Sequence, residues 1–136
     1  MSVGYSATPL PKKLGIVAST RLAVIGGPDD YEDLSGPLTV GAERLPKLTR
    51  KANLVHLFVI HREELATRLR ELRDRLDDEA EIWVSWPKKA SKVPTTVTEG
   101  VIREIALPLG FVDIKVCAVS DVWSGLKLVV RKALRA

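Results

Sequence analysis

The feature that most constrains this fold is the alternation of buried strands with amphipathic helices. The run NLVHLFVI (53–60) is continuously apolar and rich in β-branched and aromatic residues, as expected of a strand buried on both faces. The segment 61–81 that follows repeats leucine at helical spacing, at Leu65, Leu69, Leu72 and Leu76. A strand followed by such a helix is typical of a parallel sheet with helices on both faces.

The flanking segments continue the alternation. RLAVIGGPDDYEDL (21–34) predicts a strand, a glycine turn and a helix that begins near Pro28. EIWVSW (81–86) predicts another strand, and FVDIKVCAV and GLKLVVRKAL (111–134) predict two strands joined by a short turn. Residues 35–52 have the weakest pattern, which fits either a short strand or a basic loop.

A further helix is predicted between the strands at 81–86 and 111–119. Thr96-x-x-Glu99 is a capping-box pattern, and Pro108 and Gly110 are typical of a helix end. We therefore expect an α/β fold, a Rossmann-like three-layer sandwich with a mostly parallel sheet that ends in an antiparallel C-terminal hairpin. A chain of 136 residues suits a single domain, 1–136, on which residues 1–20 pack as an N-terminal leader.

Composition restricts the location and the partner. The single cysteine, Cys117, excludes an internal disulfide, and neither an export signal nor an apolar run of about 18 residues is present. We expect a cytoplasmic protein that is not inserted in a membrane. The net charge is +4, and no acidic residue precedes Asp29, while basic clusters occur at 44–51, 88–92 and 127–135. Such clusters favour an anionic partner.

Most of the chain carries sequence blocks that resemble a known family. The blocks are GYSATPLPKKLGI, LAVIGGPDDY, LVHLFV, WVSWPKKAS and TEGVIREIALPLGFVDIKVCAVSDVWSGLKLV. They resemble a small bacterial family known only as a domain of unknown function, so the resemblance supports the fold and implies no activity.

The order of elements resembles a second, larger group, the class I S-adenosylmethionine-dependent methyltransferase fold. In that fold the first strand ends in an acid and a G-x-G-x-G loop, and the second strand ends in an acid that holds the ribose. Here the first strand ends in VIGGPDD, and only about 26 residues separate Gly27 from the strand at 53. The resemblance implies a reduced methyltransferase-like topology. We therefore predict no cofactor and keep S-adenosylmethionine as the weaker alternative.

Other catalytic patterns are missing from the sequence. Two histidines and one cysteine do not make a zinc site, and neither a P-loop nor a G-x-S-x-G motif occurs. His56 lies within the apolar run and is interpreted as a hydrogen-bonded core histidine. Cys117 is interpreted as a small buried side chain. No catalytic residue and no metal site are predicted.

A candidate site follows from the geometry of parallel sheets, which bind ligands outside the carboxyl ends of their strands. Unusual residues follow each predicted strand at that edge, and two lysines of the acid-free leader are candidates to join them. The candidate ligand-binding residues are Gly26, Gly27, His61, Trp86, Lys88, Lys89, Lys92, Trp123, Ser124, Lys12 and Lys13.

Each of these residues also has a purely structural explanation. The two glycines suit a tight turn, the tryptophans suit the rim of the core, and the lysines suit a solvated loop. The function predicted is a non-enzymatic binding module with a basic, tryptophan-flanked site for a nucleotide-like molecule or a nucleic acid. The alternatives are an enzyme with a degenerate cofactor pocket and a protein-interaction module, and a homo-oligomer is left open.

Overall fold

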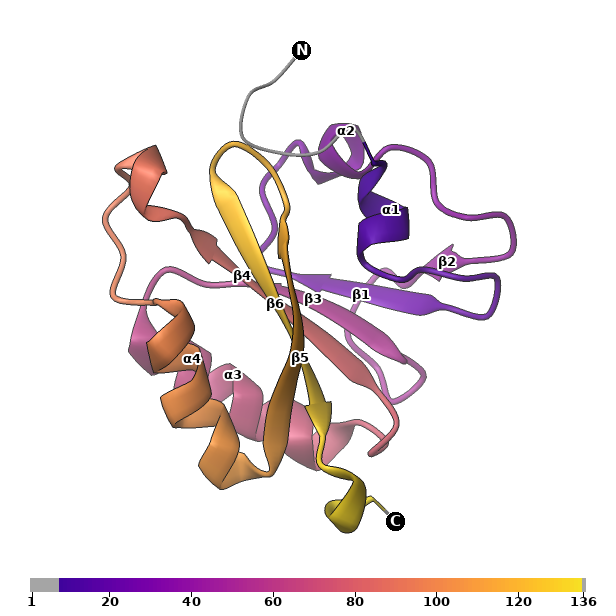
Figure 1. The fold of residues 1–136 in the computed structure, drawn as a ribbon. Helices are drawn as coiled ribbons and strands as arrows, with labels where there is room; N and C mark the ends of the chain where they lie inside the picture. Colours follow the sequence, from indigo (N-terminus) through magenta and orange to yellow (C-terminus); the bar gives the residue numbers. More distant parts are fainter. Residues whose placement is uncertain (1–7, 136) are drawn as a thin grey trace.

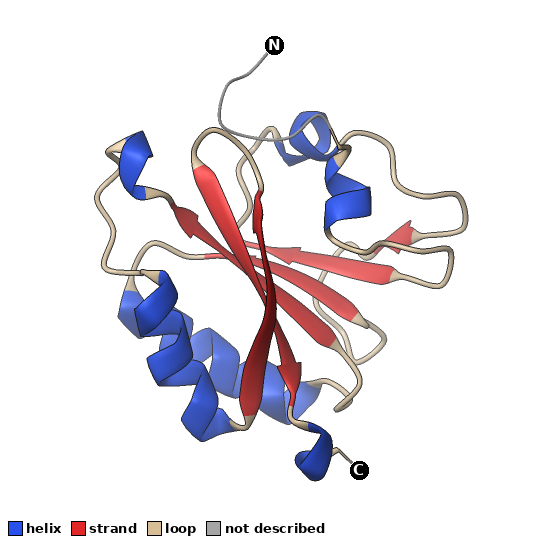
Figure 2. Ribbon diagram, viewed as in Figure 1, coloured by secondary structure: helices blue, strands red, loops and turns tan. Residues whose placement is uncertain are grey.

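The structure, a computed structural model, describes residues 8–135. Its centre is a six-stranded sheet with the strand order β2-β1-β3-β4-β6-β5, and helices lie on both faces (Figures 1 and 2). The predicted Rossmann-like α/β sandwich is confirmed. The strands are β1 (Arg21–Ile25), β2 (Glu43–Arg44), β3 (Leu54–Phe58), β4 (Glu81–Pro87), β5 (Phe111–Ala118) and β6 (Trp123–Val130). The helices are α1 (Leu10–Lys13), α2 (Tyr31–Ser35), α3 (Arg62–Arg75) and α4 (Glu99–Ala106), with 3-10 turns η1 (Lys89–Ser91), η2 (Leu107–Leu109) and η3 (Lys132–Leu134).

The strand directions are those expected of a parallel sheet that ends in an antiparallel hairpin. β1 pairs in parallel with β2 and β3, and β3 pairs in parallel with β4. β6 enters between β4 and β5 and is antiparallel to both. The carboxyl ends of β1, β3, β4 and β5 therefore lie at one edge of the sheet.

The connection between β1 and β3 is short. The chain leaves β1 toward β2 and then returns across β1 to β3, so strand order reverses between β1 and β3. Only α2, with five residues, and β2, with two, lie in this connection. The short strand that the sequence left open at 35–52 is thus β2, and the predicted truncation of this half is confirmed.

The longer helices cover one face of the sheet. The leucine stripe of α3 is buried with two residues of α4 against the central strands; the helix residues are Leu65, Leu69, Leu72, Ile102 and Ala106. Burying a leucine side chain is worth about 1.5–3 kcal/mol. This packing confirms the amphipathic helix that the leucine spacing predicts.

The N-terminal elements cover the opposite face. Leu10 and Leu14 of α1, with Ile16 after it, are buried in a second cluster that contains Leu54 and Trp83 of the sheet. Within the predicted leader, the buried residues of this cluster begin at Leu10, and residues 1–7 lie outside the described part of the chain.

The beginning of α4 differs from the sequence-based prediction. Thr98, not Thr96, is the N-cap, and its Oγ1 accepts a hydrogen bond from the Val101 amide at 3.1 Å. The Oγ1 of Thr96 instead accepts from the Arg62 amide at 2.8 Å, at the start of α3. The capping box read from Thr96 and Glu99 is therefore wrong. The predicted end of this helix is confirmed, since α4 passes into η2 and Gly110 adopts a φ of 98°.

Two of the described α-helices, α3 and α4, are eight residues or longer. α3 is 14 residues long and α4 is 8. Over residues 8–135, no helix has both the length and the apolar composition that crossing a membrane requires. The cytoplasmic location stays a prediction.

Candidate functional site

The predicted carboxyl edge exists and gathers the turns that follow four strands. The glycine turn follows β1, His61 follows β3, Lys88 follows β4, and the turn 119–122 follows β5. The Lys88 amide donates a hydrogen bond to the Val122 carbonyl at 2.8 Å, which joins the last two of these segments.

The glycine turn is explained by packing within the protein. Gly26 has a φ of 69°, and a Cβ there would lie 2.8 Å from the Phe58 carbonyl oxygen of β3. A Cβ on Gly27 would lie 2.7 Å from Cγ1 of Val24. Gly26 is therefore required for the turn to lie against β3, and Gly27 avoids a close contact with the Val24 side chain of β1, so the tight-turn interpretation accounts for both without a ligand.

Trp86 does not reach the edge as an aromatic wall, so this part of the prediction is wrong. It lies inside β4, is 8% exposed and packs in the core beneath α3 and α4. Alternation along the strand puts Trp83 and Ser85 on the α1 face and Trp86 on the other. Ser124 pairs with Trp86 in the β4–β6 ladder, so it shares the face of Trp86.

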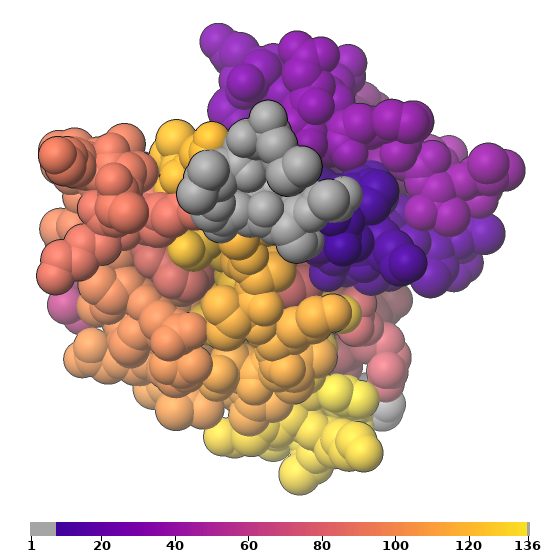
Figure 3. Space-filling view, turned by 45° about the horizontal axis from the view of Figure 1, so that its top comes forward, coloured from indigo at the N-terminus to yellow at the C-terminus, as the bar shows by residue number. Residues whose placement is uncertain are grey.

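The basic residues do not form one site. Lys89 and Lys92 are exposed in the loop around η1 and Lys88 is half-buried, while His61 is exposed just before α3. Lys12 and Lys13 lie on α1, on the other side of the β5–β6 hairpin (Figures 1 and 3). Lys13 Nζ donates a hydrogen bond to the Ala118 carbonyl at 2.8 Å. The idea that Lys12 and Lys13 join Lys88 and Lys89 is wrong.

Replacing Lys88 and Lys89 together by alanine should leave the fold intact. Solvated side chains of this kind change the free energy of unfolding by about 0.5 kcal/mol or less each. Urea unfolding followed by circular dichroism measures the change. A loss of several kcal/mol would show that this loop supports the core.

A pocket of about 290 Å³, here called the edge pocket, opens between the β1–α2 connection and the β5–β6 turn. Two carboxylates, an indole and Ser120 are among the groups that line it. The Ser120 Oγ accepts hydrogen bonds from the Val122 and Trp123 amides, each at 3.1 Å, which hold the turn in shape. The lining residues are Pro28, Asp30, Leu34, Ser120, Asp121, Val122 and Trp123.

Four aromatic rings fill the α1 side of the sheet below this pocket. The Phe58 ring stacks on His56 with 4.3 Å between centroids and meets Trp123 edge to face at 4.9 Å. Tyr31 contacts the Phe58 and His56 rings edge to face at 5.7 and 5.4 Å. Trp123 is therefore both a core-rim residue and a wall of the edge pocket.

A buried chain of hydrogen bonds runs through this cluster. Tyr31 Oη lies 2.8 Å from Nδ1 of His56, and His56 Nε2 lies 2.7 Å from the Ser85 Oγ. Burial lowers the pKa of His56 to about 3, so the ring is neutral at physiological pH. Burial also raises the pKa of Tyr31, against the opposing charge of Arg44. The prediction of a hydrogen-bonded core histidine is confirmed.

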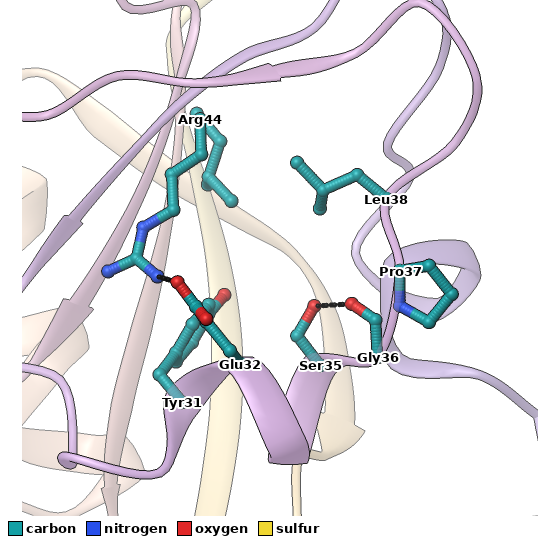
Figure 4. Close-up of a pocket in the computed structure, with 8 residues that line it drawn as sticks. Tyr31, Glu32, Ser35, Gly36, Pro37, Leu38 and Arg44 are labelled. Carbon is teal, nitrogen blue, oxygen red and sulfur yellow. Dashed lines mark hydrogen bonds and ion pairs between the residues drawn. The ribbon is translucent and has the colours of Figure 1, made fainter.

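A second pocket, about 390 Å³ in volume, lies between α2 and β2 (Figure 4). Arg44, the last residue of β2, pairs with the Glu32 carboxylate at 3.5 Å and lies over the Tyr31 ring at 5.2 Å. The Ser35 hydroxyl donates a hydrogen bond to the Gly36 carbonyl at 2.9 Å. This pocket was not predicted, because its lining combines residues of β1, α2 and β2 that no local sequence pattern connects. Metal binding has no support within residues 8–135, where no three His, Cys, Asp or Glu side chains come together.

Comparisons with known proteins identify the fold. No protein-family model matches the chain, and no curated protein is detectably similar to it, so the resemblance to a family of unknown function is not confirmed. The structure is similar to a riboflavin-derivative dimethyltransferase, RosA from Streptomyces davawensis, with a TM-score of 0.58, 14% identity, and 82% of this chain and 49% of that chain covered. It is also similar to the B. subtilis tRNA methyltransferase TrmK, with a TM-score of 0.56, 12% identity, and 89% of this chain and 63% of that chain covered. A third similar structure is human N-acetylserotonin methyltransferase in complex with S-adenosylmethionine, with a TM-score of 0.57, 10% identity, and 83% of this chain and 48% of that chain covered.

These similarities concern the fold, and they correct one prediction. The chain spans between about half and two-thirds of the length of these three enzymes. The prediction of no cofactor is contradicted, because the similar structures are methyltransferases and the human one was solved with S-adenosylmethionine. The described residues form a shortened class I methyltransferase fold.

Proposed function

We propose that this chain is a methyltransferase-fold domain that binds S-adenosylmethionine through the edge pocket. The observation that carries the proposal is the position of two carboxylates, Asp30 and Asp121, in a pocket beside the glycine turn. In open α/β sheets this edge, close to the reversal of strand order, is where ligands bind.

The chemistry of the pocket suits the charged end of this cofactor. S-adenosylmethionine carries a positively charged sulfonium, and its amino-acid end holds an ammonium group beside a carboxylate, so this end of the molecule has a net positive charge. The carboxylates of Asp30 and Asp121 attract positive charge, and the indole of Trp123 adds a cation–π surface. The ligand proposed for this edge is therefore a cation, whereas the sequence-based prediction for it was an anion.

The size of the pocket limits how much of the molecule it holds. Sites that enclose a whole drug-sized ligand measure roughly 300–1,000 Å³, and the edge pocket has about 290 Å³. The fit is therefore to the amino-acid and sulfonium end. The ribose-holding acid that the resemblance places at the end of the second strand is replaced by Arg44, which pairs with Glu32. The proposal concerns binding, and it assigns no residue to methyl transfer.

Thermal unfolding in the presence of cofactor tests this proposal. S-adenosylmethionine should raise the Tm in a concentration-dependent way, since a ligand at 100 times its Kd adds about 2.7 kcal/mol to the free energy of unfolding. S-adenosylhomocysteine, which lacks the sulfonium charge, should bind more weakly.

Variants locate the site. Replacing Asp30 and Asp121 together by asparagine should weaken binding about tenfold or more, because contacts to charged groups contribute about 1.5–3 kcal/mol. Asp74→Asn, an exposed acid on α3, is the matched control and should bind like the parent protein. The absence of any Tm shift at millimolar cofactor would refute the proposal, as would equal binding by the double variant.

A further inference from the structure

The pocket between α2 and β2, here called the α2–β2 pocket, combines an apolar lining with a single ion pair. Its volume of about 390 Å³ falls within the range of roughly 300–1,000 Å³ that is typical of small-molecule sites. The apolar lining comes from β1, from α2 and from the segment that follows α2, at Leu22, Tyr31, Pro37 and Leu38. Such a lining suits the apolar part of a small ligand.

The two charged residues of this lining are Glu32 of α2 and Arg44 of β2. The Arg44 guanidinium lies over the ring of the buried Tyr31, which gives it a defined position on one side of the pocket. Figure 4 shows Pro37 and Leu38 on the opposite side. The pocket therefore presents a positive group and a negative group next to each other, with 3.5 Å between the nearest charged atoms, across from an apolar surface.

The ion pair of this pocket is exposed, so a ligand can compete for both of its charges. The Glu32 side chain is 89% exposed and the Arg44 side chain 39%. Exposed ion pairs are weak, because water competes for each charge and the two long side chains lose freedom when they pair. Within residues 8–135, the Arg44 side chain has no printed partner besides Glu32 and the Tyr31 ring, and a guanidinium has five N–H donors. Donors of Arg44 thus remain for a ligand.

We infer that the α2–β2 pocket binds a free α-amino acid with a large apolar side chain. The ligand carboxylate pairs with Arg44, since a guanidinium binds carboxylates through two parallel hydrogen bonds, and the ligand ammonium pairs with Glu32. The apolar side chain lies against Leu22 and Leu38. A simple carboxylic acid would meet the like charge of Glu32, and a simple amine would meet that of Arg44. The inference does not depend on cofactor binding at the edge pocket.

Methyl NMR titration of the whole chain tests the inference. L-phenylalanine at millimolar concentration should shift the methyl resonances of Leu22 and Leu38, because its ring lies beside them. Three related compounds each lack one part of this ligand: 3-phenylpropionate has no ammonium, 2-phenylethylamine has no carboxylate, and glycine has no apolar side chain. Each should bind at least roughly fivefold more weakly than phenylalanine, because each loses one of the three contacts.

Charge-removing variants assign the two contacts. Arg44→Gln should abolish the preference for phenylalanine over 2-phenylethylamine, and Glu32→Gln should abolish the preference over 3-phenylpropionate. Arg62 and Glu104 form the matched control, because they are a second exposed ion pair between two elements, with 3.8 Å between their charged atoms. Arg62→Gln and Glu104→Gln should both bind phenylalanine like the parent protein.

The variant of the edge pocket separates this inference from the proposed function. With Asp30 and Asp121 both replaced by asparagine, the protein should bind phenylalanine unchanged, and a loss there would place the amino acid in the edge pocket and overturn the inference. Equal binding of phenylalanine and 3-phenylpropionate would also overturn it, as would unshifted Leu38 methyl groups or an equal loss in the Arg62 and Glu104 variants. None of these results bears on S-adenosylmethionine binding, which the Tm measurements test by themselves.

Discussion

Replacing Trp83 by alanine is expected to lower the free energy of unfolding by about 3–5 kcal/mol, the range for removing a large aromatic side chain from a core. Trp83 has no exposed surface and is the largest fully buried side chain of the described residues. It also connects the centre of the sheet to α1. Domains of this kind have a total stability of about 5–15 kcal/mol, so the variant should lose a large part of it. Urea unfolding followed by circular dichroism measures the loss.

Trp83→Phe separates packing from the hydrogen bond. This variant keeps most of the ring but removes the donor to the buried Leu14 carbonyl, which should cost about 1–3 kcal/mol. The two variants together apportion the contribution of Trp83. If the alanine variant were within 1 kcal/mol of the parent protein, the position of α1 on the sheet would be wrong.

A second large effect on the free energy of unfolding is expected when the pH is lowered. The pKa of His56 is about 3 in the folded protein and about 6.5 in an unfolded chain. Between these values the unfolded state binds one more proton than the folded state, so stability falls as the pH falls. The loss approaches about 1.4 kcal/mol per pH unit and should reach about 2 kcal/mol between pH 7.5 and pH 5. Urea titrations at a series of pH values measure it.

The two histidines of the chain provide the control. His61→Gln should keep the acid sensitivity, since His61 is exposed and its side chain caps no helix. His56→Leu should be less stable at pH 7.5, because Tyr31 and Ser85 lose their partner, and its stability should be nearly constant down to pH 5. A parent protein with the same stability at pH 7.5 and pH 5 would contradict a neutral, buried His56.

The fold could be predicted from the sequence because its signals are local. The apolar run at 53–60 and the leucine stripe of α3 depend only on spacing, and the parallel order follows from their alternation. The N-cap of α4 was assigned to the wrong residue because Thr96 and Thr98 are both threonines just before the first residue of the helix. Which one caps the helix depends on the neighbouring α3, where Thr96 is already used.

The candidate site was harder to predict because it depends on which face each side chain takes. Trp86 stands beside a proline and three lysines in the sequence, yet alternation along β4 places it in the core. Asp30 and Asp121 are 91 positions apart and meet only because the β5–β6 turn folds toward α2. Tyr31, on α2, forms its buried hydrogen bond with His56 of β3, which is 25 positions away in the sequence. Local patterns do not contain such pairings.

The outer edge of the sheet has a consequence for how this protein behaves at high concentration. β5 is the last strand, and its unpaired backbone groups are a template for a strand from another molecule. Its register shifts between Asp113 and Lys115, and Lys115 itself is charged and exposed. An incoming strand would meet a distorted backbone and a repelling charge in the middle of the edge. An irregular register and a charged residue on the edge are features that disfavour edge-to-edge pairing between molecules.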